Sequence, residues 1–247
     1  MMMNVISAAV QWFDGIGLDY AFLLSPYDRQ AWLDGIVTTL NLVAVTLVLS
    51  LILGVLFSAM LTSERRYLAL PTRWFVELTR NTPTLVQIYF AVLVLNMLIN
   101  LHVTDGAANN PLTAYVWVVI VLAMHYGALH AEALRAGIGA VPDVMRESAR
   151  SMGFNRYQLL TLVDLPIATR FALPALVNNL VNLVKSTSLG AAVAVGEVTY
   201  ASLMIWSQRD NVLELMILLL AIYSLLTWLV AVAGRYLEEK LRMPGYA

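Results

Sequence analysis

The sequence predicts an all-α membrane protein with about five transmembrane helices. Of its 247 residues, 60% are hydrophobic and only 13% are charged, whereas soluble domains average roughly 45–50% and 25%. The charged residues are clustered, which leaves several uncharged stretches long enough to cross a bilayer. Most arginines lie in alternate connections between these stretches, as expected for a multi-pass membrane protein.

The N-terminal segment, residues 1–30, is expected to form one or two amphipathic turns on the outer membrane surface. It has no basic region at its start and is interrupted by polar and glycine residues, so it does not resemble a cleaved signal peptide. Ser25 and Pro26 are suited to the cap and first turn of the next helix.

Five apolar segments are the predicted spans. They run from about Gly35 to Thr62, Pro83 to Thr104, Leu112 to Ala131, Phe171 to Gly196 and Leu215 to Gly234. We expect the second span to have Pro83 at its first helical position, capped by Asn81 or Thr82. A basic loop, Glu64 to Thr82, precedes it, and a turn-rich loop, Asp105 to Pro111, follows it.

The distribution of basic residues predicts the orientation. They gather in the Glu64 to Thr82 loop, around the connection between the third and fourth spans, and in the C-terminal tail. Only Arg29 and Arg209 fall on the opposite side, and Lys185 lies within a span. Because cytoplasmic loops are enriched in lysine and arginine, the N-terminus is expected outside and the C-terminus in the cytoplasm.

A charged segment from Val141 to Pro166 interrupts the apolar chain. Pro142 and Asp143 suit the first turn of a helix, and Gly153 suits its end. A second short helix can begin with Asn155 as N-cap and is expected to end before Pro166.

The first of these helices is predicted to have two faces. Val141, Met145, Ala149 and Met152 recur at helical spacing on one face, while the charged residues Arg146, Glu147 and Arg150 are expected to point elsewhere. A short helix with one apolar face is expected to dock on another surface.

The same segment carries a family signature. Glu147, Ser148 and Ala149 are followed after three residues by Gly153, and after nine more by the run from Val163 to Pro166. This spacing resembles the EAA signature of bacterial ABC importer permeases, E-A-A, x3, G, x9, I-x-L-P. Ser148 and Val163 depart from it, and Val144 and Met145 replace a Gly-Gln pair that often precedes it. The alternative is an ordinary cytoplasmic loop with helical turns.

Three further stretches resemble the polar amino-acid branch of these permeases. They are ELTRNTPTLVQ at residues 77–87, the E-x-x-R-x-G-I pattern from Glu132 to Ile138, and NLVKSTSL at residues 182–189. Leu129 departs from the tyrosine that many relatives have three residues before the glutamate.

The resemblance implies a type I ABC importer permease fold over residues 31–247, preceded by the periplasmic-side segment 1–30 and containing a cytoplasmic coupling helix within residues 141–166. It assigns contact with the ATPase to the signature and its neighbours: Pro142, Met145, Arg146, Glu147, Ser148, Ala149, Met152, Gly153, Leu165 and Pro166.

The resemblance also implies the partners. These are two ATPase subunits that bind ATP and Mg, a second permease subunit (a further copy or a sister chain), a periplasmic solute-binding protein, and the lipid bilayer of the bacterial inner membrane. The chain itself is expected to be a translocation subunit, not an enzyme, and to bind no cofactor, because it contains no G-x-x-x-x-G-K-[ST] phosphate loop.

The fourth span contains the main polar signal within the predicted membrane region. Asn178, Asn182 and Lys185 share one helical face, and Thr187 and Ser188 follow. A lysine within a span is costly and normally faces a bundle interior or a wet cavity, so these residues are candidates for a substrate pathway. Alternatively, the asparagines join helices and Lys185 donates to backbone carbonyls.

Arg80, Thr82 and Gln87 complete the predicted pathway. The resemblance places this corner near the cytoplasmic mouth and gives it a part in gating. Structure alone offers an alternative, because Glu77 and Arg80 can pair at i, i+3 and Thr82 with Pro83 can begin a helix.

Other chemistry is disfavoured by the composition. The net charge of −1 and the lack of a basic patch with interleaved aromatics argue against nucleic acid, and no cysteine can form a disulfide or a thiolate metal site. The histidines are His102, His125 and His130; the last two have an H-x4-H spacing, but we expect them to line a helix bundle and not to bind metal.

The predicted function is ATP-driven import of polar amino acids or analogues such as opines. Acidic amino acids such as glutamate or aspartate are included because Lys185 would favour a carboxylate. Two alternatives remain at this point: an ion-coupled transporter or channel for a small polar solute, and a structural membrane-anchor subunit.

Overall fold

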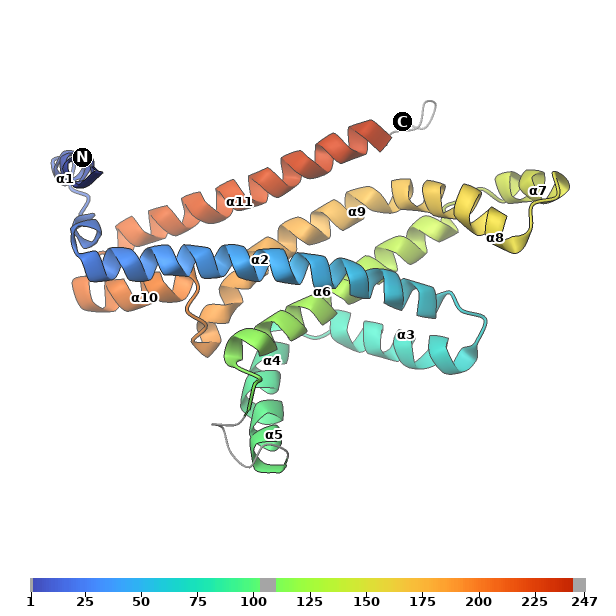
Figure 1. Cartoon of the computed structure of the whole chain (residues 1–247), viewed down its shortest axis with the longest axis horizontal. Coiled ribbons are helices and arrows are strands. Elements are labelled where there is room, and N and C mark those ends of the chain that lie inside the picture. The colour runs from blue at the N-terminus through green and yellow to red at the C-terminus, as the bar shows by residue number, and fades with distance from the viewer. Residues whose placement is uncertain (1, 103–109, 242–247) are drawn as a thin grey trace. The chain divides into compact units, whose positions relative to one another are not determined.

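The computed structural model of the protein describes residues 2–102 and 110–241, and within these ranges it contains helices and no strands. The elements in Figure 1 are α1 (Met2–Asp14), η1 (Ala21–Leu24), α2 (Pro26–Leu61), α3 (Arg66–Arg80), α4 (Thr84–Tyr89), η2 (Phe90–Leu95), α5 (Asn96–His102), α6 (Ala114–Gly139), α7 (Asp143–Ser151), α8 (Arg156–Leu159), η4 (Leu160–Asp164), α9 (Leu165–Ser186), η5 (Thr187–Val193), α10 (Val198–Arg209) and α11 (Val212–Leu241). The segments η1 and η5 are 3₁₀-helices, and η2 and η4 are π-helices.

Five helical segments of the described chain are long and apolar enough to cross a membrane, which confirms the predicted number of spans. They are Pro26–Leu61, Thr84–His102, Ala114–Gly139, Arg156–Val193 and Val212–Leu241. The helices are longer than the apolar stretches because the polar residues that flank these stretches are also helical. The predicted loop at residues 105–109, the end of the second span at Thr104 and the tail residue Arg242 lie outside the described residues.

Two local predictions about the first and second spans have different outcomes. Helix α2 begins at Pro26, and the Ser25 hydroxyl accepts a hydrogen bond from the Asp28 amide at 3.4 Å, which confirms the predicted cap. Helix α4 begins at Thr84, one residue later than predicted. The Thr82 hydroxyl donates to the Leu78 carbonyl at 2.9 Å, so Thr82 closes α3 and does not cap α4.

The predicted Glu64 to Thr82 loop is mostly the helix α3, and the fourth span begins earlier than predicted. We expected the helix after Asn155 to end before Pro166 and a separate span to start near Phe171. Instead α8, η4 and α9 are continuous from Arg156. The wider π turn of η4 comes just before Pro166, where the missing N–H and the ring would otherwise disturb an α-helix.

The chain divides into two compact units, each assembled from three stretches. The first consists of Met1–Val45, Ile88–Val119 and Val184–Thr227, and the second of Thr46–Gln87, Ile120–Leu183 and Trp228–Ala247. The divisions fall within α2, α4, α6, α9 and α11, so neither unit corresponds to a contiguous sequence domain.

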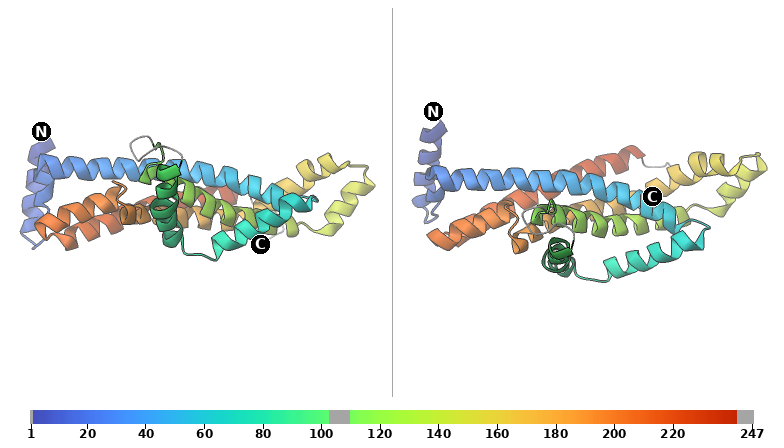
Figure 2. Two further views of the ribbon diagram at one scale, coloured as in Figure 1. Left: turned by 90° about the horizontal axis from the view of Figure 1, so that it is seen from below. Right: turned by 60° about the horizontal axis from the view of Figure 1, so that its bottom comes forward.

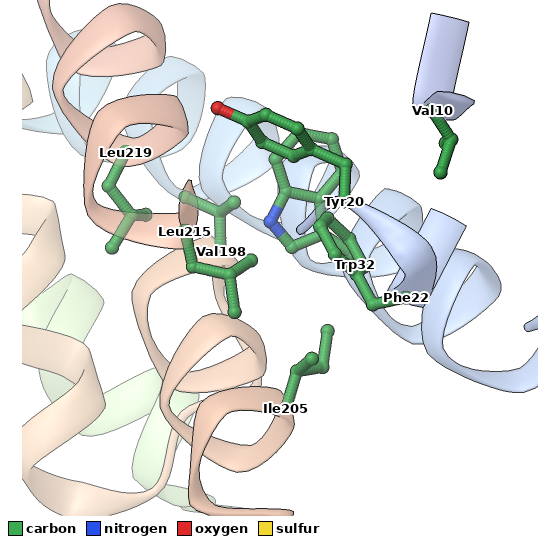
Figure 3. Packing of buried hydrophobic residues seen from close by; sticks show 8 residues of the cluster. All are labelled: Val10, Tyr20, Phe22, Trp32, Val198, Ile205, Leu215 and Leu219. Carbon is green, nitrogen blue, oxygen red and sulfur yellow. The ribbon is translucent and has the colours of Figure 1, made fainter. Parts of the chain in front are cut away.

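In the first unit, α10 packs along the first turns of α2. A Cβ at Gly35 would lie only 3.0 Å from the Ala201 Cβ, so glycine permits this close approach. Figure 3 shows the adjoining apolar cluster, in which residues of the N-terminal segment meet α2, α10 and α11. Its buried members are Val10, Tyr20, Phe22, Trp32, Val198, Ile205, Leu215 and Leu219. Part of the apolar surface of residues 1–30 is therefore covered by protein.

In the second unit, α3 packs on the last turns of α2 and on α6 through Leu61, Val76, Ala128 and Ala131. The short helices α7 and α8 lie side by side, as both views in Figure 2 show. The second unit thus presents the charged segment predicted from the sequence as a compact helical hairpin.

Candidate functional site

Helix α7 is defined by local signals at both ends. Pro142 has an extended backbone (φ −62°, ψ 133°) and is the N-cap, so the helix begins at Asp143, one residue after the predicted proline. At the other end Gly153 adopts φ +83°, the Phe154 amide donates to the Ala149 carbonyl at 3.1 Å, and the Gly153 amide donates to the Arg150 carbonyl at 2.9 Å. This pair of bonds is a Schellman motif, which requires the left-handed residue that glycine supplies.

The faces of α7 differ in part from the prediction. Val141 and Ala149 are buried, as the apolar pattern indicated, and Met145 is half-buried. Met152, however, is 70% exposed. Arg146, which was expected to point away, turns inward and its side chain is only 20% exposed. The prediction from periodicity was wrong for Arg146 because its charged side chain pairs with a partly buried carboxylate elsewhere in the chain.

That partner is Asp164, which sequence analysis did not single out. Arg146 Nε donates to Asp164 Oδ1 at 2.8 Å, and Arg146 Nη2 donates to the Ile138 carbonyl at 2.7 Å. The hydrogen bond to Asp164 raises the pKa of Arg146 above its already high ordinary value. Beside this pair is a cavity of about 310 Å³, whose lining is charged except for Leu159: Asp143, Arg146, Glu147, Arg150, Leu159 and Asp164.

The remaining signature residues are divided between the surface of α7 and the start of α9. Glu147 and Ser148 are exposed on α7, next to Val144, which is 71% exposed. Leu165 and Pro166 are exposed at the start of α9. Asn155 caps α8 as predicted, with a reciprocal capping box to Gln158 at 2.9 Å and 3.0 Å.

The Arg80 corner is held together differently from the expected i, i+3 pair. Arg80 approaches Glu132, with 3.7 Å between Nη1 and Oε2, and does not pair with Glu77 among the described contacts. Arg135 also binds Glu132, at 2.8 Å. The structure thereby brings together two stretches that the family resemblance singled out separately.

Gln87 and Thr82 also come together at this corner. The Gln87 amide donates to the Thr82 hydroxyl at 2.6 Å and to the Thr79 carbonyl at 2.7 Å. Because Thr79 and Thr82 lie at and just beyond the end of α3, Gln87 fixes the turn between α3 and α4. These contacts give Gln87 and Thr82 a structural role, which is to hold the turn between α3 and α4.

The polar residues of α9 have different environments. Asn178 is exposed and Asn182 half-buried on α9, and Lys185 is exposed in its last turn. Thr187 is fully buried and donates to the Val184 carbonyl at 2.8 Å, so its hydroxyl is occupied within the protein. Ser188 is half-buried and donates to the Lys185 carbonyl at 2.7 Å.

Glu197 is a second residue that sequence analysis did not single out. It is fully buried at the N-cap of α10 and accepts hydrogen bonds from the amides of Thr199 and Tyr200, at 3.0 Å and 2.9 Å, and from the Tyr223 hydroxyl at 2.9 Å. A signal existed, because Glu197 is the only carboxylate between Asp164 and Asp210.

Among residues 2–102 and 110–241, no three or more potential metal ligands lie together. His125 Nε2 lies 3.2 Å from the Thr84 hydroxyl, and His130 is fully buried. A Cβ at Gly54 would lie 2.5 Å from the His130 Cβ, so the backbone passes very close to this side chain.

Five apolar spans and a short, partly exposed helix between two of them indicate a multi-pass membrane protein. Residues 47–243 match the family described as binding-protein-dependent transport system inner membrane component, and the chain belongs to this family. It is therefore a non-catalytic translocation subunit of the inner membrane.

Curated relatives agree with this assignment. The chain is 31% identical over 225 residues to the octopine transport system permease OccM of Rhizobium radiobacter, covering 90% of each chain. It is 26% identical to the arginine transport system permease ArtQ of Bacillus subtilis, covering 85% of this chain and 92% of the relative. The predicted resemblance to ABC permeases of the polar amino-acid branch is thereby confirmed.

Solved structures support the same fold. A crystal structure of an amino acid ABC transporter with histidines matches with a TM-score of 0.76 and 26% identity, covering 89% of this chain and 98% of that chain. An inward-facing methionine ABC transporter, MetNI, shares the fold with a TM-score of 0.65 at 18% identity. The predicted type I importer fold is confirmed.

Proposed function

We propose that this chain is the permease subunit of an ATP-driven, binding-protein-dependent importer of polar amino acids or opines. The observation that carries the proposal is α7, a helix that bears the start of the family signature and exposes Val144, Glu147 and Ser148, with Met152 exposed at its C-cap. Large apolar side chains exposed beside polar ones are typical of a surface that another protein covers. The partner on this surface is one of two ATPase subunits that bind ATP and Mg.

The remaining partners follow from the class of importer. A second permease, either a further copy or a sister chain, pairs with this one, and a periplasmic binding protein delivers the substrate. The binding protein is proposed to dock on the outer loops, including Val198 to Asn211, and much of this stretch is the partly buried helix α10. Contact is therefore proposed for its exposed end, Ser207–Asp210.

The substrate pathway is proposed to follow the polar residues of α9. Asn178 and Lys185 are exposed on the single chain, and a second permease that covered them would create an enclosed polar path. Arg80, Thr82 and Gln87 are proposed to border its cytoplasmic end. An α-carboxylate is the natural ligand of a lysine, and it is common to all amino acids and opines. The names of four relatives refer to octopine, arginine, nopaline and, as a probable substrate, glutamine, which supports the broad class over acidic amino acids alone.

Replacing Lys185 tests its contact with substrate. We expect Lys185→Met to lower the maximal uptake rate of the reconstituted importer about tenfold or more, because a charged hydrogen-bond partner of roughly 1.5–3 kcal/mol is lost. Lys240→Met removes the same charge from an exposed position near the end of α11 and should leave uptake unchanged. Unchanged uptake in Lys185→Met would contradict the contact, and loss of assembly would favour a structural role.

Co-purification with the ATPase tests the function itself. The ATPase encoded beside this chain should co-purify with the native protein and be lost with Gly153→Asp, which adds a charged side chain next to the exposed end of α7. Gly17→Asp is the matched control, since Gly17 has φ +84° and open space around it, as Gly153 does.

If no ATPase binds either form, the importer assignment fails. Uptake in ATP-depleted vesicles driven by an ion gradient would then identify an ion-coupled transporter or channel.

A further inference from the structure

The guanidinium of Arg146 joins three parts of the second unit. It binds Asp164 at the end of η4 at 2.8 Å and the Ile138 carbonyl in the last turn of α6 at 2.7 Å. Its third nitrogen lies 3.3 Å from Asp143 Oδ1 in the first turn of α7 itself. One side chain of α7 is thus bonded to the two longer helical segments on either side of it in sequence.

Few side chains of α7 are buried. The helix has nine residues, and the one that is buried within it is Ala149, whose methyl group offers little surface. The other charged side chains of α7 do not share the position of Arg146. Asp143 is 86% exposed, and Glu147 and Arg150 are exposed.

The Arg146–Asp164 pair is partly withdrawn from solvent. The two side chains are 20% and 14% exposed, so the loss of either partner leaves the other charge poorly solvated. The planar fork of arginine reaches the carboxylate and the carbonyl in fixed directions, which a lysine ammonium cannot reproduce with one point charge. The pair therefore fixes both the position and the orientation of α7.

Asp164 is continuous with the helix that carries the polar residues. It is the last residue of η4, and α9 continues directly from Leu165 to Asn178 and Asn182. The Arg146 guanidinium is therefore a direct bonded connection between α7 and the residue that precedes α9.

We propose that Arg146 is a positioning residue that transmits movement of α7 to α9 through its ion pair with Asp164. This proposal rests on the proposed function, in which the ATPase binds α7. Without the ion pair, α7 can still move with the ATPase, but this movement is no longer transmitted to α9. The expected defect is ATP hydrolysis that no longer drives transport, with the ATPase still bound.

The test uses the complete importer, with both permease subunits, the ATPase and the binding protein, in proteoliposomes. The measured quantity is the number of ATP molecules hydrolysed per substrate imported. We expect Arg146→Met and Asp164→Asn each to raise this ratio at least fivefold. The co-purified ATPase should stay at the native level, because the Arg146 side chain is bonded to Asp164 and only 20% exposed, so it contributes little to the surface that the ATPase covers. Arg146→Lys should have an intermediate ratio.

The double variant distinguishes one joint action from two separate ones. If the residues act through each other, the ratio in Arg146→Met/Asp164→Asn is no higher than in the worse single variant. The matched control is the nearby ion pair between Arg156 and Glu64, whose side chains are 87% and 75% exposed. Arg156→Met and Glu64→Gln should keep the native ratio.

The outcomes separate this inference from the function on which it rests. A native ratio in Arg146→Met would overturn the inference and leave the importer intact. If both single variants lose the ATPase, Arg146 is needed for docking or folding, and the inference is again overturned. An absence of ATP-driven uptake in the native complex would contradict the proposed function instead.

Discussion

Single glycines determine how closely helices approach within the second unit. A Cβ at Gly137 would lie 2.3 Å from the Ala168 carbonyl oxygen and 3.1 Å from the Ala172 Cβ, so α6 and α9 are in backbone contact there. Two residues further along α6, a Cβ at Gly139 would meet nothing within 4 Å. The two positions share one helix and one residue type but differ in their surroundings.

This difference predicts opposite effects of alanine. Gly137→Ala should destabilise the protein by about 1–3 kcal/mol, because backbone atoms must move to admit the methyl group. Gly139→Ala should be neutral or stabilising by up to about 1 kcal/mol, since alanine loses less backbone freedom on folding. Thermal unfolding in detergent compares the two, and equal effects would contradict a close approach at Gly137.

Arg146 makes a contact that sequence periodicity cannot predict. Its place in the pattern put it on the polar side of a two-faced helix, and that prediction was wrong because the side chain is satisfied by Asp164, eighteen positions away. Asn155 was predicted correctly, since its capping partner Gln158 is three residues along the chain. Local hydrogen bonds are predictable from sequence, and tertiary ones require the fold.

At the scale of elements, Glu197 holds α10 to two other helices. In addition to the Thr199 and Tyr200 amides, it accepts from the Tyr223 hydroxyl on α11 and from the Thr39 hydroxyl on α2, the latter at 3.4 Å. Burial raises the pKa of Glu197, and the hydrogen bonds from Thr199 and Tyr200 oppose that rise. A single carboxylate thus caps one helix and braces it against two neighbours.

Glu197→Gln should therefore destabilise the first unit. The amide nitrogen of glutamine would face groups that already donate, and leaving a buried donor unsatisfied costs about 1–3 kcal/mol. Glu239→Gln, at an exposed position on α11, removes the same charge and should have little effect. The measurement is the unfolding temperature in detergent, and a native value for Glu197→Gln would show that the network does not stabilise the fold.

Helix ends were the least predictable elements. The apolar stretches gave the number of spans, because bilayer crossing depends on composition. The predicted ends of the spans were wrong where polar residues continue the helix or where the chain changes to another helical form. The fourth span, for example, was predicted to begin near Phe171 and begins at Arg156. Pro166 predicted that the helix would break before it, but the chain stays helical there through the π turn of η4.

At the scale of the whole molecule, an odd number of spans leaves the two ends on opposite sides of the membrane. The basic residues predict an outer N-terminus and a cytoplasmic C-terminus. The protein contains no cysteine, so single cysteines introduced by substitution can be labelled without background.

Two exposed serines provide the test. Ser151→Cys in α7 should react with a membrane-impermeant maleimide only after the cells have been permeabilised. Ser207→Cys in α10 should react in intact cells. Both substitutions replace one oxygen by sulfur and should preserve the fold. The reverse labelling pattern would mean that the orientation is inverted and that α7 cannot meet a cytoplasmic ATPase.

The π turn of η4 also sets how the helix that follows it is rotated about its own axis. A π turn accommodates one residue more than the α-helical turn it replaces, and each residue of an α-helix corresponds to a rotation of about 100°. If the same residues formed an ordinary α-helix, the additional residue would rotate everything beyond it by about 100°, including Asn178 and Asn182. Removing one residue from Leu160–Asp164 would instead restore an ordinary turn and leave the direction of these side chains nearly unchanged. The direction in which α9 presents its polar side chains therefore depends on the π turn that comes before its first residue.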